Sequence, residues 1–436
     1  MKNKIKPAPS LFRPESWSSS SFFSLAKELI SRFSLRNTFI SLRYRNYRLW
    51  FWGQMISLFG TWMQGTALSF FIFELTHSSA YLGYMGFATG LPMWFFATYG
   101  GVIADRFSRR SLLLGTQSFM MLLALVLSAL TFTHVIQPWF MLILAFFLGI
   151  AQAFDAPARQ ALVAELVPRE DLTNAIALNS TMVNMAFFLG PAISGLIYTY
   201  FGPAWCFLIN GLSFLAVIIS LILIKLQPSK KKETGNSVFE DLGQGLKYLR
   251  QQPLILALIT NIAVLSLLGS GTLTLLPAWA VRMLHGDART NGWLQSARGL
   301  GALVGALFIA SLGRFHFRGR LLTLGAFSLP LLMIIFSFAS HLGLSLLILF
   351  IVGLAIIMVA NLSNSLVQGL VDDAIRGRVM GLYALAFFGF MPLGSLWIGQ
   401  MAEILGERQA VLLNAGLFLA FLTTIWVLRP EIKKLE

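Results

Sequence analysis

Apolar residues run along the chain in long stretches that no charge interrupts. Segments such as 112–131, 207–224 and 342–360 contain no charged residue. A helix of about 20 apolar residues is long enough to cross the hydrocarbon core of a bilayer. Because lipid offers no hydrogen bonds to the backbone, only helices and closed barrels span it, and these unbroken runs lack the alternation of barrel strands. The pattern therefore predicts an all-α polytopic membrane protein.

The apolar runs divide into twelve predicted transmembrane helices, which form two six-helix halves. The predicted spans are 47–75, 80–104, 112–133, 138–162, 174–200, 204–225, 254–284, 291–312, 321–339, 342–366, 379–405 and 409–427. The expected organisation is a basic cytoplasmic N-terminal segment (1–46), an N-terminal half (47–226), a cytoplasmic linker (227–253), a C-terminal half (254–428) and a cytoplasmic tail (429–436).

The linker has a helical pattern of its own. Phe239, Leu242, Leu246 and Leu249 recur at helical spacing. This spacing predicts an amphipathic helix on the inner membrane face. In the N-terminal segment, residues 22–40 mix Phe and Leu with Lys and Arg, which fits either an interfacial helix or a disordered basic tail.

The two halves repeat in sequence when they are shifted by 204 residues. Gly149 then meets Gly353, and four further pairs follow in the same register: Gly190 with Gly394, Gly195 with Gly399, Gly202 with Gly406, and Asn210 with Asn414. Many transporters consist of two such six-helix halves, with the substrate path between them.

The formal net charge of +15 is distributed by loop. Most of the Lys and Arg residues fall in the termini and in alternate loops, so the positive-inside rule places both termini in the cytoplasm. This distribution argues against a nucleic-acid partner and favours the lipid bilayer. Isolated histidines and a single cysteine give no metal site. The glycines at 299, 301 and 305 do not follow a strand, so they do not form a dinucleotide loop.

One charged stretch interrupts the apolar pattern between the second and third predicted helices. It contains Gly101, Asp105, Arg106, Arg109 and Arg110. Their spacing resembles the loop signature of the major facilitator superfamily, G-x3-D-R-x-G-R-R, with Ser108 where Gly is usual. The stretches 154–180 and 376–383 resemble the bacterial branch that includes the enterobactin exporter and macrolide-efflux proteins. The resemblance covers about 42–429 and implies a transporter of the bacterial inner membrane.

Asp105, the acid in this stretch, can be interpreted in two ways. It is a solvated turn residue, or its carboxylate binds the N-terminus of the eleventh helix, an interaction worth roughly 0.3–1 kcal/mol. The resemblance implies the second, a gate that closes the cytoplasmic side. We expect the gating set to be Gly101, Asp105, Arg106, Arg109, Arg110, Asp155 and Arg159.

Asp155 lies within the fourth predicted helix, where acids are costly and usually functional. It can pair with Arg159 one turn away and join the gate through Arg106 or Arg109, it can carry the coupling proton, or it can lie near the interface without a function. Glu74 and Glu403, near the outer ends of helices one and eleven, are further candidates for proton coupling.

A stretch in the fifth helix resembles the antiporter element of the superfamily: Gly190, Pro191 and Gly195 match it, and Ser194 departs from it. Two positions where arginine is frequent carry Ala145 and Phe187 instead, which weakens the case for proton antiport.

Polar residues inside the spans are candidates for lining a substrate cavity. They are Gln54, Ser57, Thr61, Gln64, Asn184 and Arg298. The first four share one face of the first helix and either line the cavity or hydrogen-bond neighbouring helices. Arg298 either attracts an anionic substrate, pairs with an acid, or extends to the outer interface.

These features predict a secondary active transporter that exports a small amphipathic compound by alternating access, driven by protons. The chain carries no Walker motif, so ATP does not drive it, and we expect no cofactor. An uptake carrier or lipid flippase on the same fold is the alternative. A non-transporting receptor and a membrane enzyme are alternatives from other classes.

Overall fold

The structure, a computed structural model, describes residues 38–106, 108–225, 238–312 and 315–435, without the side chains of 97–106 and 238–242. Within these ranges the regular elements are helical. The prediction for residues 22–40 lies almost entirely outside them. So do most of the 1–46 segment and the side chains of Asp105 and Arg106 in the predicted gate.

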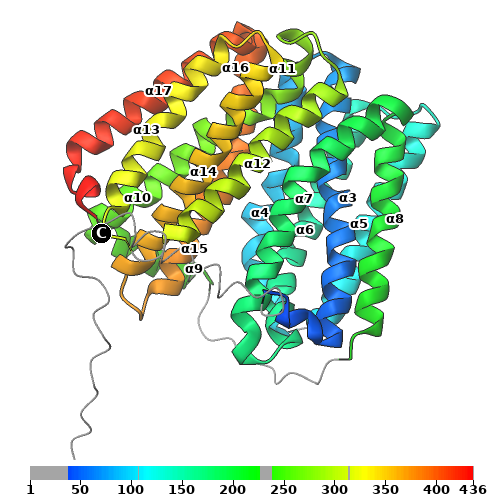
Figure 1. The fold of residues 1–436 in the computed structure, drawn as a ribbon, viewed down its shortest axis with the longest axis horizontal. Coiled ribbons are helices and arrows are strands. Elements are labelled where there is room, and N and C mark those ends of the chain that lie inside the picture. Colours follow the sequence, from blue (N-terminus) through cyan, green and yellow to red (C-terminus); the bar gives the residue numbers. More distant parts are fainter. Residues whose placement is uncertain (1–37, 107, 226–237, 313–314, 436) are drawn as a thin grey trace, which may run out of the picture.

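The first six long helices form one group, the N-terminal bundle (Figure 1). It consists of α3 (Arg45–Thr76), α4 (Ser79–Arg106), α5 (Arg109–Phe132), α6 (Pro138–Leu166), α7 (Leu172–Phe201) and α8 (Pro203–Leu223). A short 3-10 turn, η1 (Ile40–Arg43), precedes α3, and another, η2 (Arg169–Asp171), connects α6 to α7.

The remaining helices form the C-terminal bundle (Figure 1). It contains α10 (Pro253–Val264), the π turn η3 (Leu265–Ser270), η4 (Leu273–Leu275), α11 (Leu276–Arg282), α12 (Ala288–Leu312), α13 (Arg318–Ser337), α14 (Leu342–Leu370), α15 (Arg376–Ala384), the π turn η5 (Leu385–Gly389), α16 (Phe390–Leu405), α17 (Glu407–Leu428) and η6 (Pro430–Lys434). In chain order, α9 (Val238–Gln251) lies between the two bundles, at the position of the predicted linker helix, and it packs on α15 and α10 of the C-terminal bundle.

Eleven helical segments of the described chain are long and apolar enough to cross a membrane. The predicted span at 80–104 is helical as α4 but is not among the eleven. Several helices begin about three residues before the predicted span, at Arg109, Arg318 and Arg376. The prediction began each span at the first apolar residue, whereas the first turn of the helix projects toward the interface and includes the arginine.

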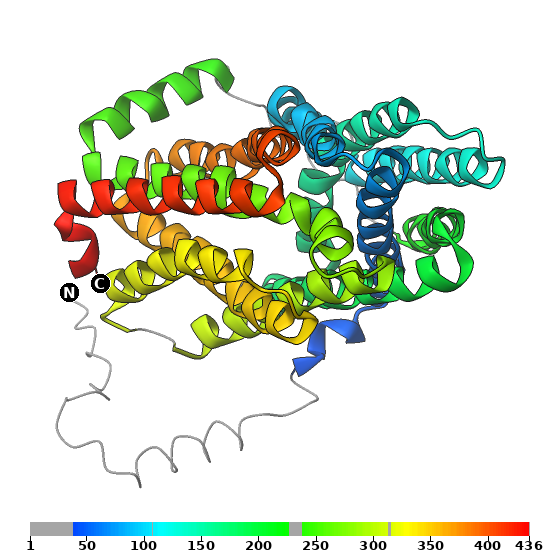
Figure 2. The same ribbon diagram turned by 90° about the horizontal axis from the view of Figure 1, so that it is seen from above.

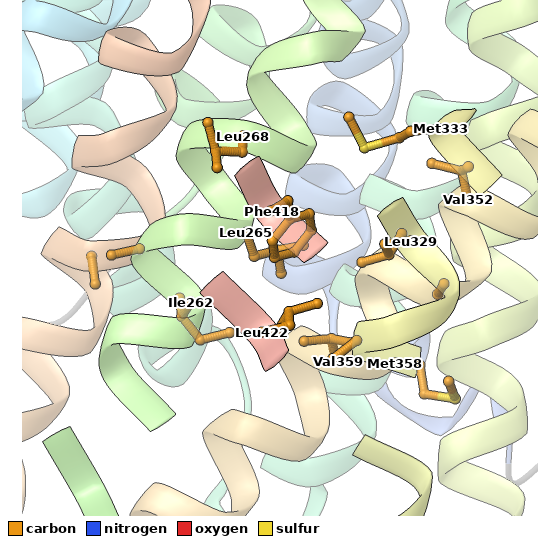
Figure 3. Close-up of a cluster of buried hydrophobic side chains, with 14 of the residues drawn as sticks. Ile262, Leu265, Leu268, Leu329, Met333, Val352, Met358, Val359, Phe418 and Leu422 are labelled. Carbon is orange, nitrogen blue, oxygen red and sulfur yellow. The ribbon is translucent and has the colours of Figure 1, made fainter. Parts of the chain in front are cut away.

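Each bundle has its own buried core. In the C-terminal bundle, Leu265 and Leu268 of the π turn meet Phe418 and Leu422 of α17, as Figure 3 shows. Leu329 of α13 belongs to the same cluster. In the N-terminal bundle, a separate cluster surrounds the start of α3 and includes buried residues of α5 to α8.

Contacts at corresponding positions agree with the internal repeat. Gly202 and Gly406 both have a positive φ, 89° and 85°, where one helix ends and the next begins. The Asn210 side chain donates to Gln64, and 204 residues later Asn414 donates to the carbonyl oxygen of Leu268, the position that corresponds to Gln64. Residues that correspond in the sequence repeat therefore also make corresponding contacts in the two bundles.

The bundles meet along two helix crossings, α7 with α12 and α4 with α16. Glycines lie at both. A β-carbon on Gly292 would lie 2.5 Å from the Pro191 carbonyl oxygen and 3.1 Å from the Gly195 α-carbon. A β-carbon on Gly399 would lie 2.7 Å from the Gly83 α-carbon. Small residues let helix backbones approach closely in a membrane, so these crossings require glycine.

The bundles converge at one end and diverge at the other (Figure 1). Figure 2 shows the two bundles side by side from above. We call the end where α4 and α17 begin the closed end, and the end that carries α9 and η6 the spread end. The crossings run from the closed end to about the middle of the interface, where Gly299 contacts Phe187 and the Trp94 indole donates to the Gly389 carbonyl oxygen.

We expect Gly292→Ala to destabilise the folded protein by about 1–3 kcal/mol, since its methyl group forces α7 and α12 apart. Thermal unfolding of the purified protein measures this as a lower Tm. Gly416→Ala is the matched control, because no atom lies within 4 Å of its β-carbon. Equal Tm values for the two variants would contradict the close-crossing account.

Candidate gating and coupling sites

A polar network joins the two bundles at the closed end. Glu407, at the start of α17, is only 4% exposed and accepts a hydrogen bond from the Ser79 hydroxyl at 2.7 Å. Arg282 at the end of α11 forms an ion pair with the same carboxylate and donates to the His77 carbonyl oxygen. Ser79 and His77 belong to the N-terminal bundle, so one buried carboxylate and its arginine tie the bundles together.

A second carboxylate strengthens this junction. Glu403 near the end of α16 accepts from the Ser78 hydroxyl at 2.9 Å and from the Ala80 backbone N–H at 3.2 Å. Ala80 lies in the first turn of α4, where backbone N–H groups have no partner within the helix and the helix dipole is positive. The C-terminal bundle therefore supplies the anion that caps a helix of the N-terminal bundle.

We call these six residues, His77, Ser78, Ser79, Arg282, Glu403 and Glu407, the closed-end latch. Of the acids named from sequence, Glu403 belongs to it, although its side chain is exposed. Glu74 is also exposed and accepts from Tyr198 of its own bundle. Glu407 was missed because it follows Gly406 at the edge of a span and resembles a loop residue. Its burial arises from the bundle packed over it, which no local pattern reveals.

Asp155 lies inside the N-terminal bundle and is 4% exposed. Its carboxylate accepts from the Thr116 hydroxyl at 3.0 Å and from the Gln117 amide at 2.7 Å, and Arg159 lies 3.8 Å away on the same helix face. The predicted Asp155–Arg159 pair is thus present. A buried carboxylate needs such compensation, because an unpaired charge in this environment is costly. The contacts fix α6 against α5.

The charged stretch between α4 and α5 is only partly described. Arg109 pairs with Glu165 of α6 and not with Asp155, and Arg110 donates to the Ile222 carbonyl oxygen at 2.9 Å. Ser108, which departs from the signature, caps α5 by accepting from the Ser111 N–H at 3.1 Å. Serine is a favoured N-cap residue, so this helix start accounts for the departure.

The candidate cavity residues on α3 and α7 hydrogen-bond to different partners or are buried. On α3, Gln64 bonds Asn210 of α8, Gln54 and Ser57 are buried, and the Thr61 hydroxyl donates to the Ser57 carbonyl oxygen. These contacts match the interhelical alternative at Gln64. On α7, the Asn184 amide donates to the Ser180 carbonyl oxygen.

Arg298 lies at the inner end of the α7–α12 crossing, about halfway along the interface between the bundles. Its guanidinium stands 4.7 Å from the centre of the Phe187 ring, on the opposite bundle. It forms no ion pair with any acid that the structure describes. The phenylalanine that replaces the frequent arginine therefore provides a cation–π partner for this charge.

The antiporter-type element contributes to packing between helices. A β-carbon on Gly190 would lie 2.6 Å from the Trp62 side chain, and Pro191 and Gly195 meet Gly292 of α12. The element thus lies where α7 crosses α3 and where it crosses α12 of the opposite bundle. Its small residues set the distance between the helices at each crossing.

We expect Glu407→Gln to open the closed end, because it removes a charge-assisted interaction worth about 1.5–3 kcal/mol. The separation can be measured between spin labels on His134→Cys and His341→Cys, exposed positions on the two bundles, in a Cys206→Ser background. The long-distance population should rise roughly tenfold or more. Glu74→Gln is the control, since its partner lies within one bundle. Unchanged distances in Glu407→Gln would show that the latch does not hold this end.

Comparison with known proteins places the chain in a family. Residues 36–436 match the family described as transmembrane secretion effector. Macrolide efflux protein A of Streptococcus pyogenes is 22% identical over 90% of this chain and 99% of its own length. The enterobactin exporter EntS of Shigella flexneri is 26% identical over 82% of this chain and 85% of its own.

A solved structure has the same fold. It is that of a bacterial homolog of the human lysosomal transporter Spinster, with a TM-score of 0.68, 16% identity, and coverage of 89% of this chain and 98% of that one. The resemblance seen in the charged stretch is thus confirmed, and the chain is a multi-pass membrane transporter with efflux-type relatives, not an enzyme. It belongs to the transmembrane secretion effector family of the major facilitator superfamily.

Proposed function

We propose that this protein is a proton-coupled exporter of a small amphipathic compound, which it moves across the bacterial inner membrane by alternating access. The observation that carries the proposal is that, among the side chains that the structure describes, the latch joins the two bundles at the closed end, while the bundles diverge at the spread end (Figure 1), as in a transporter in one of two alternating states. The relatives that export a macrolide and enterobactin support the direction and the kind of cargo. Uptake on the same fold is the alternative that a direction assay distinguishes.

The proposal includes twelve membrane-spanning helices in two halves, 47–226 and 254–428. Eleven segments have the length and composition of spans, and α4, with 28 residues, is the twelfth. The matched contacts at Gln64 and Leu268 support two equivalent halves. We assign α9 and the remainder of 227–253 to the linker between them, and 429–436 to the tail.

Charge supports the orientation. Arg109, Arg110, Lys247, Arg320 and Lys433 lie at the spread end or in its loops, and the positive-inside rule places such loops in the cytoplasm. Both termini are then cytoplasmic, and the closed end faces outward. The arrangement corresponds to a state open toward the cytoplasm.

Two carboxylate caps would alternate during transport. In the present state, Glu403 of α16 caps the first turn of α4. In the opposite state, Asp105 near the end of α4 would cap the first turn of α15, as the superfamily signature implies. A ligand or proton that weakens one cap while the other can form shifts the population between the states.

The cargo site in this proposal lies between the bundles, at the level where Arg298 meets Phe187. Trp62 packs edge-to-face against the same ring, with 4.6 Å between centroids. Aromatic walls with few polar groups suit amphipathic cargo. Arg298 is the charged group available there for an anionic part of the cargo.

We expect Asp155→Asn to reduce export and exchange together, because Asp155 fixes α6 through Arg159 and two hydrogen bonds and its loss impairs the conformational cycle. Proteoliposomes with a labelled macrolide measure both: uptake into inverted vesicles under a pH gradient, and exchange without one. Glu74→Gln and Glu403→Gln are assayed beside it. Loss of export alone at Asp155 would contradict this assignment and make it the proton carrier. No export by the wild type with any amphipathic probe would contradict the proposed function.

We expect Asp105→Asn to cripple transport while membrane insertion stays intact, because the neutral amide keeps the size of the side chain but loses the capping charge. Arg106→Lys keeps the charge that sets topology and loses the forked geometry of the guanidinium. Wild-type transport by both variants would leave the stretch with a topological role only.

A further inference from the structure

A groove opens on the outer surface of the C-terminal bundle, away from the interface between bundles. Its volume is about 570 Å³, and it is lined by Arg320, Leu324, Phe327, Leu331 and Lys433, among others. A second hollow of about 460 Å³ shares Arg320 and Lys433 with it and extends to Lys434. The two therefore form one site whose apolar part and basic part meet at Arg320 and Lys433.

The apolar part follows one face of α13. Leu324, Phe327 and Leu331 lie four, seven and eleven residues after Arg320, which is the spacing of one helix face. Eleven residues correspond to a length of about 16 Å, which is close to half of the roughly 30 Å hydrocarbon core. Leu324 is 64% exposed and Leu331 50% exposed. The groove thus presents apolar surface over the depth of one leaflet.

The basic part is assembled by η6, which folds back onto the first turn of α13. The Gly319 N–H donates to the Leu435 carbonyl oxygen at 2.9 Å, and a β-carbon on Gly319 would lie 2.1 Å from the Ile432 carbonyl oxygen. This close seat places Lys433 beside Arg320. Figure 1 shows the end of the chain next to the start of α13.

The wall of the groove is fixed by α17. The Trp426 indole donates to the Thr323 hydroxyl at 2.8 Å, and its ring packs edge-to-face on Phe327 with 5.6 Å between centroids. A preformed wall of this kind lowers the cost of ordering a bound chain.

Charge identifies the occupant. The side chains of Arg320 and Lys433 are exposed. Neither side chain forms an ion pair or hydrogen bond with any residue that the structure describes. The acid on η6, Glu431, is opposed by Lys433, Lys434 and the two arginines at the start of α13, Arg318 and Arg320. The N-terminus of α13 adds its own partial positive charge. A phosphate group at this point is attracted both by the basic side chains and by the N-terminus of α13.

We propose that this groove binds one anionic phospholipid of the leaflet at the spread end, with its phosphate between Arg320 and Lys433 and an acyl chain along Leu324, Phe327 and Leu331. Basic pockets beside transmembrane helices are suited to anionic head groups. A zwitterionic lipid fits less well, because its ammonium group would lie among like charges. The proposal does not depend on the direction of transport.

Native mass spectrometry of the purified full chain tests it, with phosphatidylglycerol and phosphatidylcholine as probes at equal concentration. We expect phosphatidylglycerol to bind as a single tight adduct, and Arg320→Gln with Lys433→Gln to weaken it about tenfold or more. The matched control is Lys247→Gln with Arg250→Gln on α9, which removes the same charge from exposed positions at the same end. Equal weakening by both pairs would overturn the site in favour of diffuse attraction.

Two further arms test the apolar part. Leu324→Trp fills the groove without changing charge and should also reduce binding, with Leu347→Trp on the exposed surface of α14 as its control. Glycerophosphoglycerol, the head group without chains, should not bind measurably. Binding of the free head group at the affinity of the lipid, or full binding by Leu324→Trp, would refute the acyl-chain assignment.

Discussion

The close approach of backbones at the two crossings between the bundles is the constraint on which the rest of the structure depends. In a bilayer, the tails are as apolar as the helix surfaces, so contact between helices relies on fit and on hydrogen bonds. At Gly292 and Gly399, the helices approach so closely that a single methyl group would not fit. The latch and the Arg298–Phe187 contact lie along this same surface, and their geometry follows from it.

The two buried carboxylates among the described residues, Asp155 and Glu407, each have several partners. Asp155 has three partners inside one bundle, whereas Glu407 has partners from both. The first arrangement fixes two helices that move together, and the second joins parts that can separate. The same chemistry, a carboxylate with an arginine and a hydroxyl, therefore serves as internal bracing in one place and as a reversible contact in the other.

The sequence predicted the helices well, since a membrane-spanning helix needs about 20 apolar residues and a run of this length can be recognised directly. It also predicted the pair of Asp155 and Arg159, because that pair lies within one helical turn. The sequence did not identify the role of Glu407. It also did not identify Glu165 as the partner of Arg109, or α8 as the helix on which Gln64 packs. Each of these depends on which helices become neighbours, and the apolar pattern is nearly the same on every helix. The repeat register was the one long-range signal, and it correctly related Asn210 to Asn414.

The π turns η3 and η5 give the C-terminal bundle two defined bending points. A π turn holds an additional residue and interrupts the regular i to i−4 ladder, so a helix bends there at little cost. Both of these turns interrupt long segments of the C-terminal bundle, 253–282 and 376–405, while α3 to α8 are assigned as continuous α-helices. Flexing of the C-terminal bundle in each transport cycle should therefore be concentrated at these two turns, whereas bending of the N-terminal bundle should occur at the prolines inside its helices, Pro92, Pro157 and Pro191.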